Sequence, residues 1–557
     1  MRRQHNRMRK LRADGLALVS AVVLTAICAV ASAAEMPHLR QQGSATQLIV
    51  DGEPYLVLGG EFGNSSTSSL DYLEPHWARL KAMHLNTVLA PVSWELIERV
   101  QGRFDFSLVD GLVADARESG LRLVLLWFGS YKNSMSSYVP AWVKRDQVRF
   151  PRAQTMDGSG QEILSAFSAN NQKADAAAFE ALMAHIAAID AEQHTVIMVQ
   201  VENEVGMLPV AREHGAEAAR AFAAPVPPEL LSYLAENRRK LASPLRSLWE
   251  ENGARQEGDW RTVFGDRTAA EEVFTAWHYA RYVEEVAKAG KRAWSLPMFV
   301  NAALNRPGRA PGEYPSGGPL PHLLDIWKAG APSIDFLSPD IYFSNYRELI
   351  KGYVRPDNPL FIPEANRAGR AESGAEAFFA IGRYDAIGYS PFSIESVPEE
   401  GMQRLSEAYD VLSQLAPLIV DHQGMGRMAG FTPPVAYDGR VSDAPESVTL
   451  GEYAFEISYV DPWVPESEQL TASHGGLILQ TGPDEYLVAG SGVTITVTPA
   501  TPGPKRAGIE SAWEGRFDGG KWTRGRRLNG DQTHQGRHLR LEPDRFGIQK
   551  ARFYRYD

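Results

Sequence analysis

Between about residues 50 and 400, short apolar runs alternate regularly with amphipathic segments. Each apolar run is followed by a polar loop and then by a stretch in which apolar residues recur at helical spacing. Near-continuous apolar runs of this length are typical of parallel strands that are buried on both faces. Eight such runs occur: Tyr55–Gly60, Thr87–Pro91, Arg122–Phe128, Thr195–Val201, Pro297–Asn301, Asp335–Ser338, Pro359–Pro363 and Ala386–Pro391.

The segments between these runs have the period of helices. They are Tyr72–Met83, Leu108–Ser119, Ala174–Glu192, Ala269–Ala289, Leu320–Ala329 and Ala375–Arg383. Repeated strand-then-helix units predict an α/β fold, and eight of them predict a (β/α)₈ TIM barrel, which we assign to residues 45–416. An open doubly wound sheet is the alternative, but no Gly-rich phosphate loop follows an early strand.

A long insertion interrupts the repeat after the fourth predicted strand. Residues 206–267 are polar and contain turn formers, including Pro225-Val226-Pro227-Pro228 and Asn252-Gly253. In a barrel this position lies at the C-terminal face, where loops carry function. We therefore expect the insertion to form part of a substrate cleft.

Beyond residue 417 the helical period gives way to alternating, β-rich segments. These are Val448–Tyr459, Gly476–Leu479, Tyr486–Ala489 and Val493–Thr498. Turn pairs separate the strand-like runs as hairpins require, namely Asp438-Gly439, Asp518-Gly519 and Asn529-Gly530. Residues 417–557 are predicted to form a C-terminal antiparallel β domain.

The first 33 residues have the pattern of a signal peptide. Six basic residues precede residue 15, an apolar run covers Leu16–Val30, and Ala31-Ser32-Ala33 resembles a cleavage site. The alternatives are a transmembrane anchor, for which the run is shorter than the roughly 20 residues needed, and a lipoprotein at Cys28. We predict cleavage near Ala33 or Ala34 and a secreted or periplasmic bacterial protein without stable membrane insertion.

Composition and charge narrow the classes of function. The chain has 557 residues, of which 44% are hydrophobic, so a large packed core is feasible. The net charge of -11 becomes about -16 once the signal peptide is removed, which argues against a nucleic-acid partner. No HExxH motif, Cys/His cluster or Asp-rich calcium loop occurs, so we predict no metal and no cofactor.

Two glutamates stand where a barrel places its chemistry. The fourth run closes with Glu202-Asn203-Glu204, and Glu364 closes the seventh. Cleaving a glycosidic bond needs a proton for the leaving oxygen and an anionic partner for the oxocarbenium-like centre. The charge of Glu364 would raise the pKa of Glu204 and keep it protonated. The simpler alternative is that each glutamate is solvated, and alternation places Glu202, a competitor, on the same side as Glu204.

At these residues the sequence resembles the clan A retaining glycoside hydrolases, and glycoside hydrolase family 35 in particular. The heptad Gln200–Gly206 is similar to the signature of the family 35 β-galactosidases. The segment from Leu85-Asn86-Thr87 to Trp94 and the pentad Gly102–Phe106 are also similar to that family, and the resemblance covers roughly residues 45–400.

The resemblance implies a role for particular residues. Glu204 would be the acid/base, Glu364 the nucleophile, and Asn203 would bind the sugar 2-hydroxyl, while Tyr342 would be hydrogen-bonded to the nucleophile. The implied activity is that of an exo-acting retaining β-galactosidase that releases terminal galactose from an oligosaccharide.

Two departures from the family pattern affect the predicted sugar pocket. Pro91–Glu95 replaces the usual Tyr-Val-Pro-Trp-Asn, and the third strand ends in Trp127–Asn133 where the family has Pro-Gly-Pro-Tyr. The sequence resembles a bacterial subgroup with a β-rich C-terminal domain, for which galactosides of plant xyloglucan are a substrate class. Another clan A specificity (arabinosidase, xylosidase or endo-glycanase) and a non-catalytic carbohydrate-binding barrel stay open.

Further polar and aromatic residues follow the predicted strands and are candidates for substrate binding. They are Glu61 and Asn64, Trp94, Lys132 and Asn133, Asn301, and Tyr342. Trp94 is expected beneath a sugar ring. The alternative for each is loop capping or packing. The C-terminal domain would bind glycan, shield the barrel or form a homodimer interface, and the sequence does not choose among these.

Overall fold

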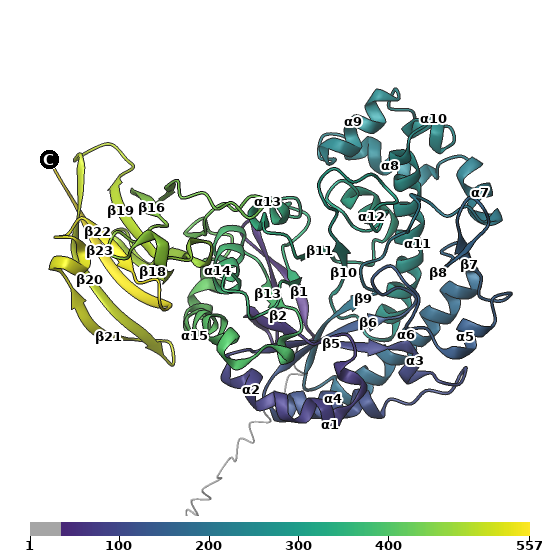
Figure 1. Ribbon diagram of the computed structural model, residues 1–557, viewed down its shortest axis with the longest axis horizontal. Coiled ribbons are helices and arrows are strands. Elements are labelled where there is room, and N and C mark those ends of the chain that lie inside the picture. The colour runs from purple at the N-terminus through teal and green to yellow at the C-terminus, as the bar shows by residue number, and fades with distance from the viewer. Residues whose placement is uncertain (1–34) are drawn as a thin grey trace, which may run out of the picture.

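The computed structural model describes residues 35–557, so the predicted signal peptide lies outside the described residues. A barrel of eight parallel strands forms its centre, with antiparallel sheets at the C-terminal end (Figure 1). This arrangement confirms the predicted TIM barrel with a β-rich C-terminal region. Among the described residues, no helix is long and apolar enough to cross a membrane.

Each of the eight predicted apolar runs contributes a strand to the closed barrel. The strands are β4 (Val57–Glu61), β5 (Thr87–Ser93), β6 (Arg122–Phe128), β9 (Val196–Val201), β10 (Met298–Ala303), β11 (Phe336–Ile341), β12 (Ile362–Ala365) and β13 (Gly388–Pro391). The barrel closes where Gly388 of β13 pairs with Val57 of β4. Almost every strand residue is buried, because helices cover the outside and side chains fill the interior.

An N-terminal sheet that the sequence pattern did not predict packs against the barrel. It consists of β1 (His38–Gln42), β2 (Ala45–Val50) and β3 (Glu53–Tyr55), which pair in an antiparallel manner. Leu48 and Val50 of β2 join an apolar cluster with inward-facing barrel residues such as Val57 and Phe361. The sheet therefore adds to the core of the barrel.

Helices surround the barrel, and the longest lie where the sequence predicts amphipathic segments. They are α4 (Ser107–Glu118), α6 (Ala169–Asp190), α11 (Thr268–Ala293), α12 (Leu324–Gly330), α14 (Ser373–Tyr384) and α15 (Glu399–His422). The predicted helix Tyr72–Met83 is broken into α1 (Leu70–Leu73), a 3-10 turn and α2 (Trp77–Ala82). Pro75 lies at the break, since it lacks the N–H that a continuous helix would use.

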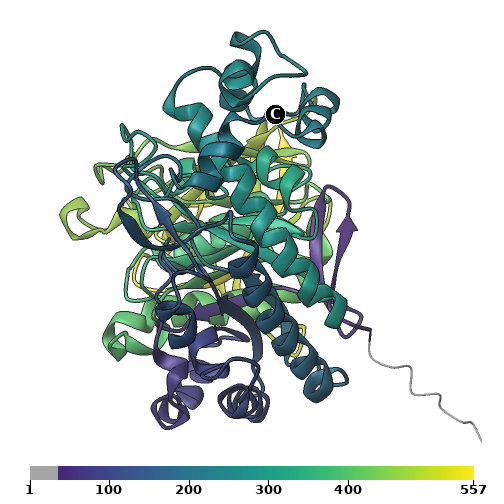
Figure 2. The same ribbon diagram turned by 90° about the vertical axis from the view of Figure 1, so that its right-hand side faces the viewer.

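Shorter elements connect these parts. Around the barrel they are α3 (Trp94–Ile97), α5 (Ala141–Arg145), the pair β7 (Arg152–Gln154) and β8 (Gly160–Leu164), and α13 (Tyr346–Lys351). Between β9 and α11 the chain forms α7 (Ala216–Ala223), α8 (Pro228–Glu236), α9 (Ser243–Glu251) and α10 (Trp260–Phe264). Phe222 and Trp260 from these helices pack edge-to-face on Phe274 of α11. Figures 1 and 2 show this group of helices at one end of the molecule, above the barrel.

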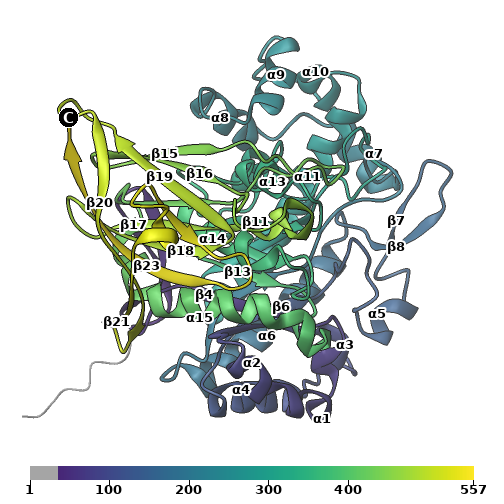
Figure 3. The same ribbon diagram turned by 60° about the vertical axis from the view of Figure 1, so that its left-hand side comes forward.

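The C-terminal region contains two antiparallel sheets (Figure 3). One has the order β14-β17-β18-β23-β20-β21 and the other β15-β16-β19-β22. The strands are β14 (Met428–Phe431), β15 (Glu446–Leu450), β16 (Tyr453–Ser458), β17 (Gly475–Gln480), β18 (Glu485–Ser491), β19 (Val493–Pro499), β20 (Arg506–Asp518), β21 (Lys521–Leu528), β22 (His538–Leu541) and β23 (Gly547–Tyr556). Residues of both sheets share one apolar cluster that includes Phe455, Tyr486 and Phe553.

Two local expectations about this region differ from the structure. The predicted boundary at residues 416 and 417 falls inside α15, which continues through Pro417 to His422. Asn529-Gly530 does not form a hairpin: β21 pairs with β20, whereas β22 pairs with β19. Asn529 instead caps a 3-10 turn over Gly530–Thr533, because its side chain accepts from the backbone N–H of Gly530. Asp518-Gly519, in contrast, does lie in the β20–β21 turn.

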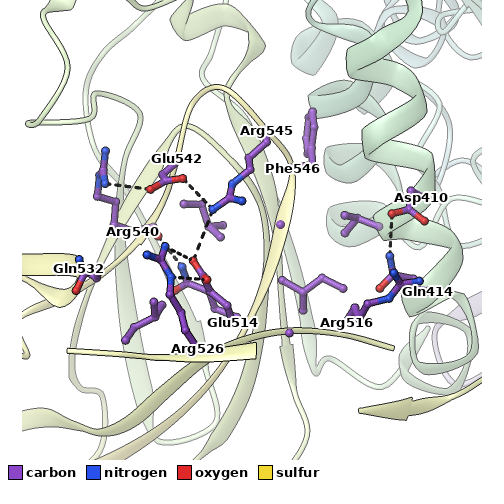
Figure 4. Close-up of a pocket in the computed structure, with 17 residues that line it drawn as sticks. Asp410, Gln414, Glu514, Arg516, Arg526, Gln532, Arg540, Glu542, Arg545 and Phe546 are labelled. Atoms are coloured by element: carbon purple, nitrogen blue, oxygen red, sulfur yellow. Dashed lines mark hydrogen bonds and ion pairs between the residues drawn. The ribbon is translucent and has the colours of Figure 1, made fainter. Parts of the chain in front are cut away.

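A polar cavity of about 260 Å³ lies where α15 meets the C-terminal sheets (Figure 4). Its lining contains ion pairs of Arg526 with Glu514 at 2.8 Å and of Arg545 with Glu542 at 2.9 Å. Phe546, at the edge of the cavity, stacks on Phe378 of α14 with ring centroids 5.4 Å apart. Helix α15 also contacts both β4 and β20, so it connects the barrel to the C-terminal region.

Candidate active site

The chain bends sharply as it leaves β9, and this bend separates the two glutamates of the Glu202-Asn203-Glu204 segment. The strand ends at Val201, and the φ angles of Glu202 and Glu204 are +60° and +47°. These are left-handed values, so the period of two that holds in a strand does not apply. The expectation that Glu202 and Glu204 lie on the same side is therefore wrong.

Glu202 points into the barrel wall. Its carboxyl accepts hydrogen bonds from the backbone N–H groups of Ser130 at 3.3 Å and Tyr131 at 2.6 Å. Burial raises its pKa well above the usual range, and the nearby charge of Asp175 raises it further. Glu202 is a buried structural acid that fixes the end of β6, and Glu204 is the residue left at the face of the barrel.

Glu204 lies in a group of three carboxyls with Asp340 and Glu364. One oxygen from each lies within 4.8 Å of one oxygen from the other two. Strand register accounts for two of them, because Asp340 of β11 is directly paired with Glu364 of β12. Asp340 was absent from the predicted candidates, since the sixth apolar run was ended at Ser338. Asp340 carries the same signal as Glu364, because both are acidic residues at the end of an apolar strand.

Burial and mutual repulsion favour the protonated forms of Glu204 and Asp340. Burial is the larger cause that raises the pKa of Glu204 to about 7, and the charge of Glu364 is the second. Burial and the charge of Glu364 also raise the pKa of Asp340 and of Glu61 well above their usual range. As predicted, the charge of Glu364 raises the pKa of Glu204, but burial raises that pKa by more.

Two hydrogen-bonded residues fix the positions of the three carboxyls. The side-chain amide of Asn301 donates to Asp340 Oδ2 at 2.5 Å, and its Oδ1 accepts from the backbone N–H of Glu204 at 3.0 Å. The hydroxyl of Tyr342 donates to Glu364 Oε1. Asn301 thus joins the ends of β9 and β11, and Tyr342 provides the hydrogen bond to Glu364 that the family resemblance implied.

Lys132 supplies a positive charge beside the carboxyls. It is buried, and its charge lowers the pKa values of Glu61, Glu204 and Asp340 relative to burial alone. Its Nζ donates to Asn203 Oδ1 at 2.9 Å. The amide nitrogen of Asn203 has no hydrogen-bond partner within residues 35–557, so a donor is free at the acid-bearing bend.

The remaining predicted binding residues divide into two groups. Glu61 closes β4 and is buried near the carboxyls, and Asn133 is exposed and accepts from Lys132. Asn64 lies in the loop after β4, and in the described part of the chain no hydrogen bond joins it to the carboxyls.

The predicted role of Trp94 is contradicted by its burial. Its side chain is fully buried, its indole N–H donates to Glu98 at 2.7 Å, and its ring packs edge-to-face on Trp142. A ring with no exposed face cannot lie beneath a sugar, so Trp94 is a core residue. Helix α3 begins at Trp94, which is one of the buried residues of this helix.

The three carboxyls could also provide oxygen ligands to a hard cation. They are the one group of acids or histidines within residues 35–557 whose ligand atoms converge to this extent. However, Asn301 and Tyr342 already occupy one oxygen each on Asp340 and Glu364, and raised pKa values favour protons on Glu204 and Asp340. The arrangement is therefore suited to proton transfer next to one carboxylate.

Comparisons with known proteins find family models that match two parts of the chain. The family model for glycosyl hydrolases family 35 matches residues 47–244, which confirms the predicted resemblance over this segment. A domain of unknown function, DUF5597, matches residues 405–540. The family 35 match includes Glu61, Lys132 and Glu204 but ends before Asp340 and Glu364, so the latter two are candidates on geometry alone.

A relative and several solved structures carry the same name. A β-galactosidase of Xanthomonas manihotis is 35% identical over 118 residues, which is 21% of this chain and 19% of the relative. Solved β-galactosidases include one from Bacillus circulans sp. alkalophilus (14% identity, 66% of this chain, 57% of that chain, TM-score 0.45) and one from Rahnella sp. R3 (14%, 66%, 57%, 0.43). The chain thus spans about a fifth of the curated relative and less than two thirds of these structures.

Proposed function

We propose that the protein is a secreted, exo-acting, retaining β-galactosidase that releases terminal β-linked galactose from oligosaccharides. The observation that supports this most directly is the meeting of Glu204 and Glu364, whose nearest oxygens lie within 4.8 Å. Retaining glycosidases place their carboxyls about 5 Å apart, whereas inverting enzymes leave roughly 6.5–9.5 Å for a water. The spacing favours double displacement.

In the first step the two carboxyls act on opposite sides of the same bond. Glu364 attacks the anomeric carbon, and the bond from that carbon to the leaving oxygen breaks. Glu204, which is neutral below about pH 7, gives its proton to that oxygen. The Tyr342 hydroxyl holds Glu364 in place through its hydrogen bond to Oε1. The free amide nitrogen of Asn203 is positioned to donate to a sugar hydroxyl.

In the second step Glu204 changes from acid to base, because Glu364 has lost its negative charge. Once Glu364 is esterified to the sugar, its negative charge no longer raises the pKa of Glu204. Glu204 can then take a proton from a water molecule, which attacks the anomeric carbon and releases the sugar with its original configuration. Lys132 favours the ionised form of Glu204 at this stage.

Galactose as the released sugar and an extracellular location are supported less directly. The family 35 match and the Xanthomonas relative support galactose. The subgroup resemblance adds xyloglucan side chains as one source of it, and the basic and apolar pattern of residues 1–33 supports export. The oligosaccharide is the partner that we propose, with no cofactor.

The proposal is tested with a panel of nitrophenyl β-galactoside, α-arabinoside and β-xyloside. We expect turnover of the galactoside, with the β-anomer of galactose seen first by NMR. Absence of galactoside turnover would exclude the specificity, and the α-anomer would exclude retention. Glu364→Gly should lose several orders of magnitude in kcat and regain activity with azide, giving an α-galactosyl azide.

A matched control is available two residues from the proposed acid. Glu204→Gln should lower kcat/KM by about 10²–10⁴-fold for substrates with poor leaving groups, since these need the proton most. Burial also raises the pKa of Glu202, but its carboxyl lies in the barrel wall, so Glu202→Gln removes a carboxyl that does not reach the sugar. If the two variants lost activity equally, the assignment of Glu204 would be wrong.

A further inference from the structure

A second cavity shares Tyr342 with the candidate active site. Its volume is about 540 Å³, and Tyr342 forms its wall on the side of Glu364, to which the tyrosine hydroxyl donates. On another side Phe392 is bridged to the backbone of Glu61 at the end of β4. A sugar bound over Glu364 would therefore have space for a neighbouring unit in this cavity.

The cavity is positively charged, although the protein as a whole is acidic. Arg367 and Arg370 line it, no acidic residue does, and neither arginine takes part in an ion pair of the described chain. Both follow Glu364 within six residues, in the loop after β12. The net charge of the whole chain is -11, so two unpaired arginines in the lining of this cavity form a local exception.

The surroundings of this pair make Arg367 the freer of the two cations. Arg370 also lines an adjoining cavity that contains Glu372 and Glu376, and it lowers the pKa of Glu376. Arg347, in that same adjoining cavity, is already bound to Glu446 at 2.8 Å. Arg370 is therefore shared with these acidic residues, whereas Arg367 lines the cavity beside Tyr342.

The rest of the lining suits a sugar ring. Tyr342 and Phe392 meet edge-to-face with centroids 6.4 Å apart, and Val397 and Pro398 complete an apolar side. Aromatic faces can pack against the C–H groups of a pyranose, while guanidinium groups bind carboxylate and sulfate oxygens through paired, charge-assisted hydrogen bonds. The amide of Asn366 is also available in the lining.

From this combination we infer that the cavity binds an acidic sugar unit next to the terminal galactose, with its anionic group at Arg367 and Arg370. The inference deepens the proposed function and rests on it. The preferred substrates are then galactosyl oligosaccharides whose neighbouring sugar bears a carboxylate or a sulfate ester. Neutral neighbours, such as those in xyloglucan, would leave both guanidinium groups without an anion.

Three matched disaccharides test this inference. They are lactose, the same disaccharide with the glucose C6 oxidised to a carboxylate, and lactose sulfated at that C6 position. The bond that breaks and the released galactose are the same in all three. We expect kcat/KM, measured from galactose release, to be about tenfold higher for at least one acidic substrate than for lactose, which corresponds to about 1.4 kcal/mol. Comparison of the two acidic substrates identifies which anion the pocket prefers.

Variants connect this preference to the arginines. In Arg367→Gln/Arg370→Gln the ratio of acidic to neutral kcat/KM should fall to about one, whereas Arg506→Gln, an exposed and unpaired arginine of β20, should leave the ratio unchanged. Added salt should also reduce the ratio in the unmodified protein, because both arginines are exposed and an ion pair at an exposed site is screened.

Equal kcat/KM for all three substrates, or a ratio that survives the double substitution, would overturn the inference. Release of galactose from none of the three would instead refute the proposed function.

Discussion

Asp340 provides the sharpest test of how protons are distributed in the site. Burial and the neighbouring charge of Glu364 hold the pKa of Asp340 well above its usual range, which favours the neutral acid. Asparagine has the shape of a protonated aspartate and can both accept from Asn301 and donate to Glu204. Asp340→Asn should therefore keep the arrangement, while Asp340→Ala removes it.

The expected size of the effect follows from the hydrogen bonds. In Asp340→Ala the amide of Asn301 loses the acceptor that it has at 2.5 Å, and that asparagine also holds the backbone of Glu204. A buried donor left without a partner costs about 1–3 kcal/mol. If this cost falls on the transition state, kcat/KM should decrease by roughly 5–150-fold. For Asp340→Asn the decrease should stay within about threefold.

The assay is the dependence of kcat/KM on pH, measured with nitrophenyl β-galactoside from about pH 4 to about pH 9. In the unmodified protein the rate should fall as pH rises through about 7, because Glu204 loses the proton that it must donate. In Asp340→Asn the basic limb should lie within about half a pH unit of its position in the unmodified protein. If Asp340→Asn lost as much activity as Asp340→Ala, or moved the limb by more than about one unit, Asp340 would be ionised and the reasoning wrong.

Three other substitutions probe separate parts of the structure. Tyr342→Phe removes a hydrogen bond to a carboxylate, and such a bond is worth about 1.5–3 kcal/mol. We therefore expect kcat/KM to fall by roughly 10–100-fold. An unchanged kcat/KM would contradict the assigned contact. Lys132→Met removes a positive charge that lowers the pKa of Glu204. The basic limb of the pH profile should therefore move to higher pH by about one unit. A shift to lower pH would refute the assigned effect of Lys132. Phe546→Ala deletes a buried ring that is stacked on Phe378. The free energy of unfolding, measured with urea, should decrease by about 3–5 kcal/mol. A decrease below about 1 kcal/mol would show that the packing between the barrel and the C-terminal region does not depend on this ring.

The barrel could be predicted because its strands are buried on both faces. Such strands need unbroken apolar runs, and that pattern is visible without knowing which strands are neighbours. The N-terminal sheet was missed for the opposite reason. Its strand β1 (His38–Gln42) is polar and at most half-buried, so only β2 (Ala45–Val50) carries an apolar signal, and a lone short run has no repeat around it.

The site could be predicted as far as strand ends define it. Glu204, Glu364 and Tyr342 all follow apolar runs, and the barrel brings the ends of such runs to one face. What could not be predicted is which way a side chain turns once the strand has ended. The left-handed residues after Val201 send Glu202 inward, and the short helix starting at Trp94 buries a ring that sequence order alone placed at the rim.

The protonation of the site is a further property that only the fold determines. Glu61, Glu204, Asp340 and Glu364 come from four strand ends, and Lys132 is the cation that lowers the pKa of the first three. One lysine cannot balance four buried negative charges, so protons must occupy most of them. Glu204 is partly exposed and its pKa is raised to about 7, while Glu61 and Asp340 are buried and their pKa values are raised well above the usual range. A carboxyl with a pKa near 7 can both lose and regain a proton near neutral pH, so the depth at which the bend after β9 leaves Glu204 suits it to be the acid and then the base.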